Sequence, residues 1–177
     1  MVINLLDPKA RQFLIKQPAA ATVVEFSPDS QWLGVATKIG KVDIWVPGSN
    51  FTIHGPDHGK EIFALAFSPD SSLLVSVGKD SHARVAKSAS GKELWSLAHG
   101  DWVEDVAFSP DGKSFATASD DNRVWVWDIA TGLAKFRLNS TGFVQKVGYS
   151  PDGQWIASTG YDQTVRIWNA ISGNKML

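Results

Sequence analysis

One short phrase recurs along the chain at a constant spacing. "FSPDS" begins at Phe26 and again at Phe67, "FSPDG" begins at Phe108 and "YSPDG" at Tyr149, so successive copies lie 41 residues apart. A fixed period of this length is typical of structural repeats that cannot bury their apolar surface without their neighbours. Ser, Pro, Asp and Gly in this order predict a tight turn. We therefore expect four similar units, each built around one such turn.

The residues around each turn predict short β-strands. "WVEDVAF", "KSFATAS", "RVWVWDI" and "LAKFRL" surround Pro110 and are separated by turn residues. In "RVWVW", Val124 and Val126 face one side of the strand and Trp125 and Trp127 the other, so both faces are apolar. A four-stranded sheet packed between two similar sheets covers both faces, as in a β-propeller blade. A helical array is disfavoured because no run sustains a 3.6-residue apolar spacing beyond about two turns.

The repeat register divides the chain into blades within a single all-β domain, residues 1–177. The predicted blades are residues 22–59, 63–100 and 104–141, with four strands each, and residues 145–177, with three strands and the start of a fourth.

Composition narrows the class of protein. The 177 residues are 44% apolar, enough for one domain with a full core. The net charge of −1 and the lack of like-charged runs give no sign of a nucleic-acid or membrane partner. Cysteine is absent, which excludes disulfides and thiolate metal sites. The first residues are too charged for a signal peptide and no stretch approaches 18 apolar residues, so we expect a soluble, cytoplasmic protein.

The segment "HGDWVEDVAFSPDGKSFATASDDNRVWVWDIATG" resembles a repeat of the WD-repeat β-propeller family, and weaker copies extend the resemblance over almost the whole chain. In that family a His from the loop leading into the blade, a Ser or Thr on the second strand, an Asp before the third strand and a Trp ending that strand form a hydrogen-bonded network. The resemblance implies a structural network of these residues: His99, Thr117, Asp121 and Trp127 in the third repeat; His58, Ser76 and Asp80 in the second, with Ala86 in place of Trp; Ser158, Asp162 and Trp168 in the fourth, with Ser140 in place of His; and only Trp45 in the first.

The chemistry of these side chains explains why they occur together. A neutral imidazole donates through one nitrogen and accepts through the other, so a His can bridge a carboxylate and a hydroxyl. Stranding one buried partner costs about 1–3 kcal/mol, so the third blade, with the complete set, is expected to be the most stable. His99, Thr117 and Asp121 could alternatively form a catalytic triad, but partial copies in other repeats favour a structural role. No cofactor or metal is expected, because His54 and His58 lie in a segment rich in helix breakers.

The last repeat lacks its fourth strand, and the N-terminus carries a candidate for it. Phe13 in "RQFLIKQ" lies 123 residues, or three periods, before Phe136. We therefore expect residues 1–18 to supply a strand that completes the last blade, within one chain or between two. Blades of the family usually form rings of seven or eight, so the resemblance favours a homodimer that closes an eight-bladed ring. A four-bladed monomer and a half-ring completed by a different chain are the alternatives.

The resemblance also implies that protein or peptide partners bind on the rim reached by the loops that lead into the blades. The register places two sets of residues there: Glu61, Trp102 and Phe143, with Ala20 at the same position, just after those loops, and Lys38, Lys79, Asp120 and Tyr161 before the third strands. Aromatic anchors beside charges are the composition of interface hot spots. Trp102 and Phe143 could instead cap the core at the blade ends.

Three functions compete. The favoured one is a non-catalytic scaffold that binds proteins or peptides. The second is a structural half-propeller, natural or engineered, with no evolved ligand; rim residues that vary between repeats while the turns stay alike argue against it. The third is an enzyme using the central channel. It is disfavoured because the innermost strands carry few polar residues, and Glu104 and Asp105 face opposite sides of their strand.

Overall fold

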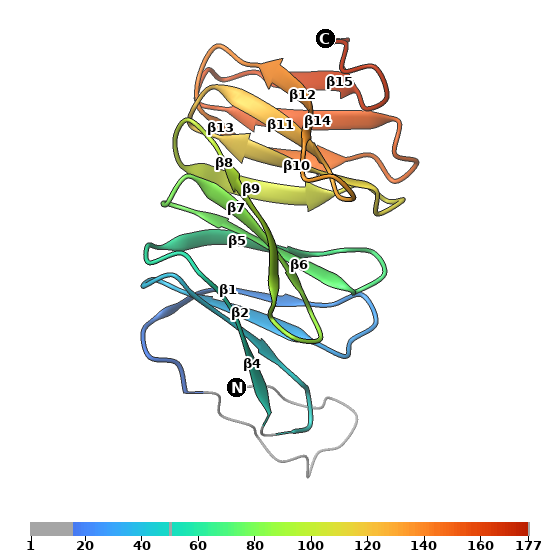
Figure 1. Ribbon diagram of the computed structural model, residues 1–177. Coiled ribbons are helices and arrows are strands. Elements are labelled where there is room, and N and C mark those ends of the chain that lie inside the picture. Colours follow the sequence, from blue (N-terminus) through green and yellow to red (C-terminus); the bar gives the residue numbers. More distant parts are fainter. Residues whose placement is uncertain (1–15, 50, 177) are drawn as a thin grey trace, which may run out of the picture.

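The computed structural model describes residues 16–49 and 51–176, and this part of the chain forms four antiparallel sheets (Figure 1). The predicted all-β fold with four sheets is thereby confirmed. Sheet 1 holds β1 (Ala21–Phe26), β2 (Leu33–Thr37), β3 (Lys41–Trp45) and β4 (Thr52–Asp57). Sheet 2 holds β5 (Ile62–Phe67), β6 (Leu73–Gly78), β7 (His82–Lys87) and β8 (Glu93–Ala98). Sheet 3 holds β9 (Val103–Phe108), β10 (Ser114–Ser119), β11 (Arg123–Asp128) and β12 (Ala134–Asn139). Sheet 4 holds β13 (Val144–Tyr149), β14 (Trp155–Gly160) and β15 (Val165–Asn169).

Strands within each sheet pair in chain order, because every connection is a short turn. No helix in the described part of the chain is long and apolar enough to cross a membrane.

The repeated phrase forms the first hairpin turn of every sheet. In sheet 1 the Ser27 hydroxyl donates to Asp29 Oδ1 at 2.6 Å and accepts from the Trp32 amide at 2.9 Å. The other three turns repeat both bonds. The fourth turn residue has a positive φ in all four copies: 61° at Ser30, 62° at Ser71, 67° at Gly112 and 71° at Gly153. The serine copies thus reach the same geometry as the glycine copies, although an L-residue in this region costs about 1–2 kcal/mol.

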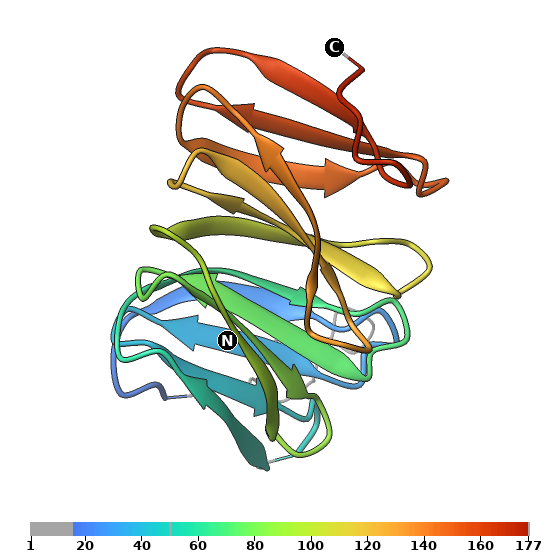
Figure 2. The ribbon, with the colours of Figure 1, turned by 45° about the horizontal axis from the view of Figure 1, so that its top comes forward.

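The sheets pack face to face in chain order, and sheets 1 and 4 lie at opposite ends of the stack (Figures 1 and 2). We call the contact between two neighbouring sheets a seam. At each seam the innermost strand of one sheet lies against the first two strands of the sheet before it: β5 against β1 and β2, β9 against β5 and β6, and β13 against β9 and β10.

Each seam contains an apolar cluster. Between sheets 1 and 2, Ala36 and Ile44 pack with Leu65 and Phe67. Corresponding clusters join sheets 2 and 3 and sheets 3 and 4. The core of the described residues is therefore spread along three seams, and a fourth buried cluster, Leu33, Val35 and Trp45, lies on sheet 1 alone.

Sheet 4 contains the beginning of a fourth strand. Lys175 forms a bridge with Trp168, and the Met176 amide donates to the Ile167 carbonyl at 2.8 Å. The counterparts of Met176 and Ile167 three periods earlier in the chain are Ile53 and Ile44, which pair in sheet 1. Lys175 and Met176 thus occupy the first positions of the missing strand, in the register of sheet 1.

The N-terminal strand expected to complete this sheet falls on residues 1–18, of which 1–15 lie outside the described residues. The described residues Lys16, Gln17 and Pro18 border a hollow with residues of β3 and β4 in sheet 1. Residues 11 and 12, the first two of "RQFLIKQ", lie four periods before Lys175 and Met176 and so share their repeat register. Lys175 and Met176 therefore occupy the first two positions of the outer strand for which "RQFLIKQ" is the candidate.

Candidate functional site

The polar network of sheet 2 centres on His58, whose side chain is fully buried. Its Nδ1 lies 2.9 Å from Asp80 Oδ1, to which it donates, and its Nε2 lies 2.7 Å from the Ser76 hydroxyl, from which it accepts. Although burial by itself raises the pKa of Asp80, the hydrogen bonds from His58 and Arg84 lower that pKa to about 2. Sheet 2 thus carries a continuous chain from carboxylate to hydroxyl without the tryptophan, whose position is taken by Ala86.

Sheet 3 connects the complete residue set differently. His99 Nε2 lies 2.7 Å from the Thr117 hydroxyl, and Trp127 Nε1 donates to the same hydroxyl at 3.2 Å. His99 Nδ1, however, donates to the Leu97 carbonyl at 3.1 Å rather than to Asp121. Burial lowers the pKa of His99 to about 4, so this imidazole is neutral at pH 7.

The Asp121 carboxylate of sheet 3 takes other donors. Its Oδ2 accepts from Trp125 Nε1 at 2.9 Å and from the Gly100 amide at 3.1 Å. The resemblance implies that His99, Thr117, Asp121 and Trp127 form one hydrogen-bonded network, but sheet 3 lacks one of its hydrogen bonds. His99 Nδ1 bonds to Leu97 and not to Asp121. A catalytic triad needs that same link, so the geometry does not support one.

Sheet 4 replaces the histidine with threonine and arginine. The Thr141 hydroxyl lies 2.6 Å from Asp162 Oδ2, Ser140 lies 3.2 Å from the same oxygen, and Arg166 Nη1 pairs with it at 2.7 Å. The hydrogen bonds from Thr141 and Thr164 hold the pKa of Asp162 well below its usual value. Trp168 Nε1 donates to the Ser158 hydroxyl at 3.3 Å, as Trp127 donates to Thr117 in sheet 3.

Sheet 1 has only fragments of this arrangement. Trp45 Nε1 donates to the Ser49 carbonyl at 3.0 Å. His54 Nδ1 lies 2.7 Å from Asp43 Oδ1, whereas His58 bonds to the carboxylate of Asp80. The two histidines considered as a metal pair therefore bind separate partners.

One position of the network escaped the sequence analysis. Arg84, Trp125 and Arg166 are 41 residues apart, and each donates to the Asp of its own sheet. The strand pattern predicts for Trp125 only packing against a neighbouring sheet. The sequence does contain a signal for the hydrogen-bonding role, because side chains with N–H donors recur two residues before Ala86, Trp127 and Trp168.

The rim residues are brought together in pairs by a backbone hydrogen bond that recurs in every sheet. In each pair, the backbone amide of the residue in the turn before the third strand donates to the backbone carbonyl of the residue that follows the loop leading into the sheet. The distance is 2.9 Å in every pair. The pairs are Lys38 with Ala20, Lys79 with Glu61, Asp120 with Trp102 and Tyr161 with Phe143. All eight residues therefore stand at the same edge of their sheets, on one frame, while their side chains differ from sheet to sheet.

Aromatic rings and charges meet on this rim across the seam between sheets 2 and 3. The Lys79 ammonium lies 4.4 Å from the centre of the Trp102 ring, and the Phe63 ring lies 6.0 Å from it. Glu61 lies 4.0 Å from the same ammonium. Trp102 nevertheless remains 39% exposed. Its ring is thus positioned by neighbours and still open to a partner.

A second aromatic pair lies on sheet 4. The Phe143 and Tyr161 rings meet edge to face with centres 6.1 Å apart, and the two residues are 47% and 65% exposed. Lys38, on sheet 1, is also exposed. The described rim thus offers two aromatic groups on sheets 3 and 4 and lysines on sheets 1 and 2.

Several carboxylates of sheet 3 lie near one another on this part of the rim: Asp101, Glu104, Asp120 and Asp121. Burial, together with the neighbouring Asp101 and Asp121 carboxylates, raises the pKa of Asp120. Burial raises the pKa of Glu104 as well, and Asp120 adds to the effect. The rim at sheet 3 is therefore negative while the adjacent rim at sheet 2 carries Lys79.

The family model described as "WD domain, G-beta repeat" matches residues 48–86, 91–128 and 133–169. The chain belongs to the WD-repeat family. Each match runs from the fourth strand of one sheet to the third strand of the next, so the repeat in the sequence overlaps two sheets in space. A search of curated proteins found no matching sequence.

Membership of the WD-repeat family implies the general role of a protein-interaction scaffold, and domains of this kind are generally non-catalytic. The four antiparallel sheets agree with the blades of a WD-repeat β-propeller.

Proposed function

We propose that this WD-repeat chain is a non-catalytic scaffold that binds a protein or peptide on the rim formed by Lys38, Glu61, Lys79, Trp102, Asp120, Phe143 and Tyr161. The observation that carries the proposal is the contrast between a constant frame and varied side chains. Four equivalent backbone bonds of 2.9 Å hold the rim positions, yet each sheet presents different chemistry there. A purely structural half-propeller has no need for such variation.

The chemistry of the rim supports a partner that combines an apolar anchor with charges. The Lys79 ammonium lies over the Trp102 ring, the Asp120 amide bonds to the Trp102 carbonyl, and the ring stays more than one third exposed. Exposed tryptophan and tyrosine rings beside charges are the usual anchors of protein interfaces, where a few such residues carry most of the binding free energy.

The test uses peptides selected from a random library displayed on phage, with the purified chain as bait. We expect Trp102→Ala and Phe143→Ala each to weaken the selected peptides at least about ten-fold, which corresponds to about 1.4 kcal/mol. Binding is measured by isothermal titration calorimetry. The melting temperature of both variants should stay within a few degrees of the parent, because both side chains are exposed.

Phe51→Ala is the matched control, since Phe51 is a 62% exposed aromatic residue between β3 and β4, at the edge of sheet 1 opposite the rim. Its loss should leave binding unchanged. Selected peptides that bind equally well to the two rim variants would contradict binding through Trp102 and Phe143. A loss of ten degrees or more in the melting temperature of the variants would instead assign these residues to the core.

We infer that the chain also associates with itself, as a homodimer in which two four-bladed halves close an eight-bladed ring through strand exchange. Two observations support this. Within residues 16–49 and 51–176, sheet 4 carries only the first positions of its outer strand, and sheets 1 and 4 lie at opposite ends of the stack (Figure 1). Unpaired sheet edges and uncovered faces favour association.

Light scattering tests self-association. We expect a mass of twice the 19.2 kDa of one chain in dilute solution. A mass of 19.2 kDa would contradict self-association and leave the rim proposal untouched.

A further inference from the structure

The three seams use equivalent repeat positions, and three of these positions change character at the last seam. They lie at the edge of the sheets opposite the rim. At the first two seams the positions hold only apolar residues: Trp32, Ile53 and Phe67 at the first, and Leu73, Leu94 and Phe108 at the second. At the third seam, between sheets 3 and 4, the same positions hold Ser114, Lys135 and Tyr149.

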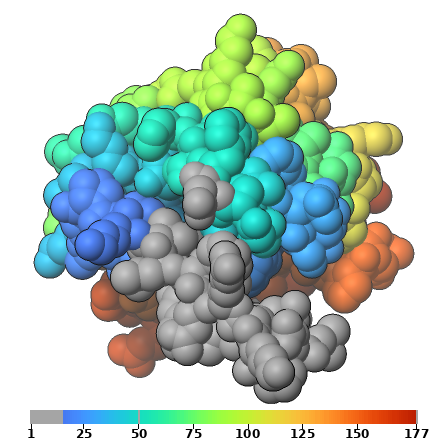
Figure 3. All heavy atoms as spheres, turned by 90° about the horizontal axis from the view of Figure 1, so that it is seen from below, coloured from blue at the N-terminus to red at the C-terminus, as the bar shows by residue number. Residues whose placement is uncertain are grey.

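The apolar residues help to close the first two seams. Ile53 and Phe67 are buried in the cluster that joins sheets 1 and 2, and Trp32 packs against this cluster. This first seam lies behind sheet 1 in Figure 3, which shows the stack from the end that sheet 1 occupies. Leu73 and Phe108 pack against the cluster that joins sheets 2 and 3. Packing alone therefore favours apolar side chains at these positions.

The polar residues of the third seam border a hollow of about 550 Å³. Its walls come from the first turns of sheets 3 and 4, the outer strand β12, the end of β13 and the turn after β15. Its lining includes Asp111, Ser114, Lys135, Tyr149, Asp152 and Ile171. Sites for small molecules have volumes of about 300–1,000 Å³, so the hollow has a suitable size.

The Tyr149 hydroxyl indicates that this hollow is more than a packing gap. The Tyr149 side chain packs against the cluster between sheets 3 and 4, as Phe108 packs at the second seam. Its hydroxyl is buried, and no residue in the described part of the chain forms a hydrogen bond with it. Burial raises the pKa of Tyr149 and the Asp111 carboxylate raises it further, so the hydroxyl keeps its proton. A phenylalanine would pack at this position without the cost of an unpaired hydroxyl.

Lys135 brings a positive charge to the same hollow. Its Nζ donates to the Ser114 hydroxyl at 3.2 Å, which links the outer strand of sheet 3 to its second strand. Ser114 is buried, whereas Lys135 is exposed. The Lys135 ammonium and the Tyr149 hydroxyl are both hydrogen-bond donors, and a carboxylate is a suitable acceptor for both.

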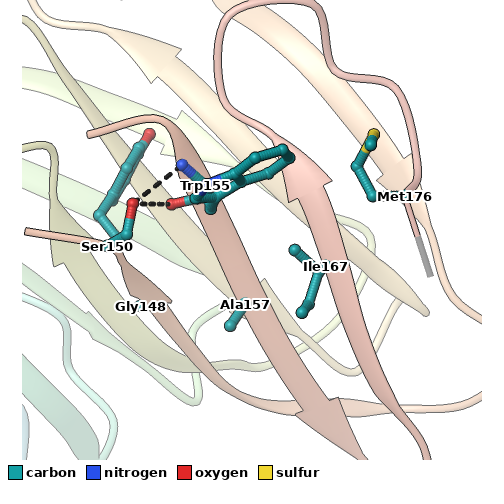
Figure 4. A pocket seen from close by; sticks show the side chains of 7 residues that line it. Gly148, Ser150, Trp155, Ala157, Ile167 and Met176 are labelled. Atoms are coloured by element: carbon teal, nitrogen blue, oxygen red, sulfur yellow. Dashed lines mark hydrogen bonds between the residues drawn. The ribbon is translucent and has the colours of Figure 1, made fainter. Parts of the chain in front are cut away.

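Two turn aspartates bring negative charge to the hollow. Asp111 Oδ1 accepts from the Ser109 hydroxyl and Asp152 Oδ1 from the Ser150 hydroxyl, each at 2.6 Å. Figure 4 shows Ser150 in its turn, with the hydroxyl bonded to the backbone amide and carbonyl of Trp155. The hydrogen bonds from these serines lower the pKa of Asp111 and of Asp152, so both carboxylates are ionised at pH 7.

The two signs of charge select a class of ligand. An inorganic phosphate would meet two carboxylates beside the one lysine, and their repulsion disfavours it. A ligand with one carboxylate and one ammonium avoids this repulsion, because each of its charges meets the opposite charge in the hollow. Ile171 is 80% exposed at the same hollow and offers contact to an apolar side chain.

We propose that the hollow at the third seam binds a zwitterionic amino acid or dipeptide with an apolar side chain. Lys135 and Tyr149 bind its carboxylate, Asp111 and Asp152 attract its ammonium, and Ile171 contacts its side chain. The site lies at the edge opposite the rim. It is therefore independent of the partner binding proposed for the rim and of self-association.

Isothermal titration calorimetry with L-leucine and with the dipeptide leucyl-leucine tests the site. We expect saturable binding of at least one of them with a Kd below about 1 mM. Two analogues of leucine carry one charge each: 4-methylpentanoate lacks the ammonium and 3-methylbutylamine lacks the carboxylate. Both should bind at least about ten-fold more weakly than the better zwitterion, and inorganic phosphate should not bind.

Substitutions that copy the second seam locate the binding. Lys135→Leu and Tyr149→Phe introduce the residues found at Leu94 and Phe108. We expect each to weaken binding at least about ten-fold. The melting temperature should stay level or rise, because Lys135 is exposed and the Tyr149 hydroxyl has no partner among the described residues. Trp102→Ala, on the rim, is the control and should bind the zwitterion as the parent does.

Four results would overturn the site. The first is the absence of saturable binding of either zwitterion to the parent chain. The second is unchanged binding in Lys135→Leu and Tyr149→Phe, which would place the ligand elsewhere. The third is equally tight binding of 4-methylpentanoate or phosphate, which would remove the role of the aspartates. The fourth is a loss of about ten degrees or more in the melting temperature of Tyr149→Phe, which would assign the hydroxyl to the core.

Discussion

Sheets 2 and 3 hold the same polar network at the same register and connect it differently. In sheet 2, His58 bridges Asp80 and Ser76 although the tryptophan is missing. In sheet 3 the residue set is complete, but His99 binds a backbone carbonyl and Thr117. The two sheets also differ in the neighbour on the third strand. Arg84 reaches one oxygen of Asp80 and leaves the other for His58.

Trp125 takes that place in sheet 3 and donates a single N–H to Asp121. Its indole also stacks on Trp127 with ring centres 5.2 Å apart, and His99 lies with its ring edge against both. His99 is thus held by aromatic contacts, where His58 is held by a carboxylate. A complete motif therefore does not ensure a complete network. Trp125 and Gly100 both donate to Asp121 Oδ2, and the buried Oδ1 of the same carboxylate has no hydrogen-bond partner among the described residues.

The largest expected effect comes from removing the two carboxylates. Asp80→Ala strands the buried His58 and leaves Glu93 as the remaining partner of the Arg84 guanidinium, and we expect a loss of about 4 kcal/mol in the free energy of unfolding. Asp121→Ala strands two neutral donors, Trp125 Nε1 and the Gly100 amide, and removes only a long ion pair of 3.9 Å with the partly exposed Arg123, so it should cost about 2 kcal/mol. Urea unfolding at one protein concentration measures both. Equal losses would contradict the distinction between the two networks.

The second effect is a pH dependence that separates the two sheets. The pKa of His99 falls from 6.5 to about 4 on folding, so the unfolded chain binds a proton in this interval and the folded chain does not. Stability contributed by neutral His99 is present above pH 6.5 and is lost as the pH falls toward 4, by about 3 kcal/mol.

Asp80 acts in a lower window. Its pKa falls from 3.8 to about 2 on folding, so its contribution is present above pH 4 and is lost only as the pH drops toward 2. Urea midpoints measured from pH 7 to pH 4 should therefore fall in the parent and much less in His99→Gln. A parallel fall in both proteins would assign the dependence to another group.

The smallest effect concerns one backbone position. Ser81 in sheet 2 and Asn122 in sheet 3 are counterparts, with φ of 64° and 67°. Asparagine tolerates this region better than serine does, so Ser81→Asn should stabilise the chain by about 0.5 kcal/mol. Asn122→Ser is the reciprocal control and should lose a similar amount. Thermal melts resolve the pair, and a change of the same sign in both would refute the explanation.

The repeat predicts the fold well because it reports register. The period of 41 residues sets the four turns at Pro28, Pro69, Pro110 and Pro151, and the strands lie on either side of them as expected. The family prediction is confirmed by the family model. Register alone also places the rim residues at one edge, since equivalent positions in equivalent sheets must lie alike.

The details that escaped prediction depend on side-chain conformation instead. Nothing in the pattern tells that His99 Nδ1 bonds to the Leu97 carbonyl while Asp121 is bonded by Trp125. The start of a fourth strand in the last repeat, in contrast, is expected from the register, and Lys175 and Met176 lie there beside β15.

The uniform backbone contact beneath the rim has an evolutionary consequence. Because the same main-chain bond holds all four positions whatever the side chain, the framework tolerates point mutations at these eight residues, and such mutations would change the specificity of the proposed rim. New recognition can therefore arise one codon at a time, without first repairing the architecture that displays it.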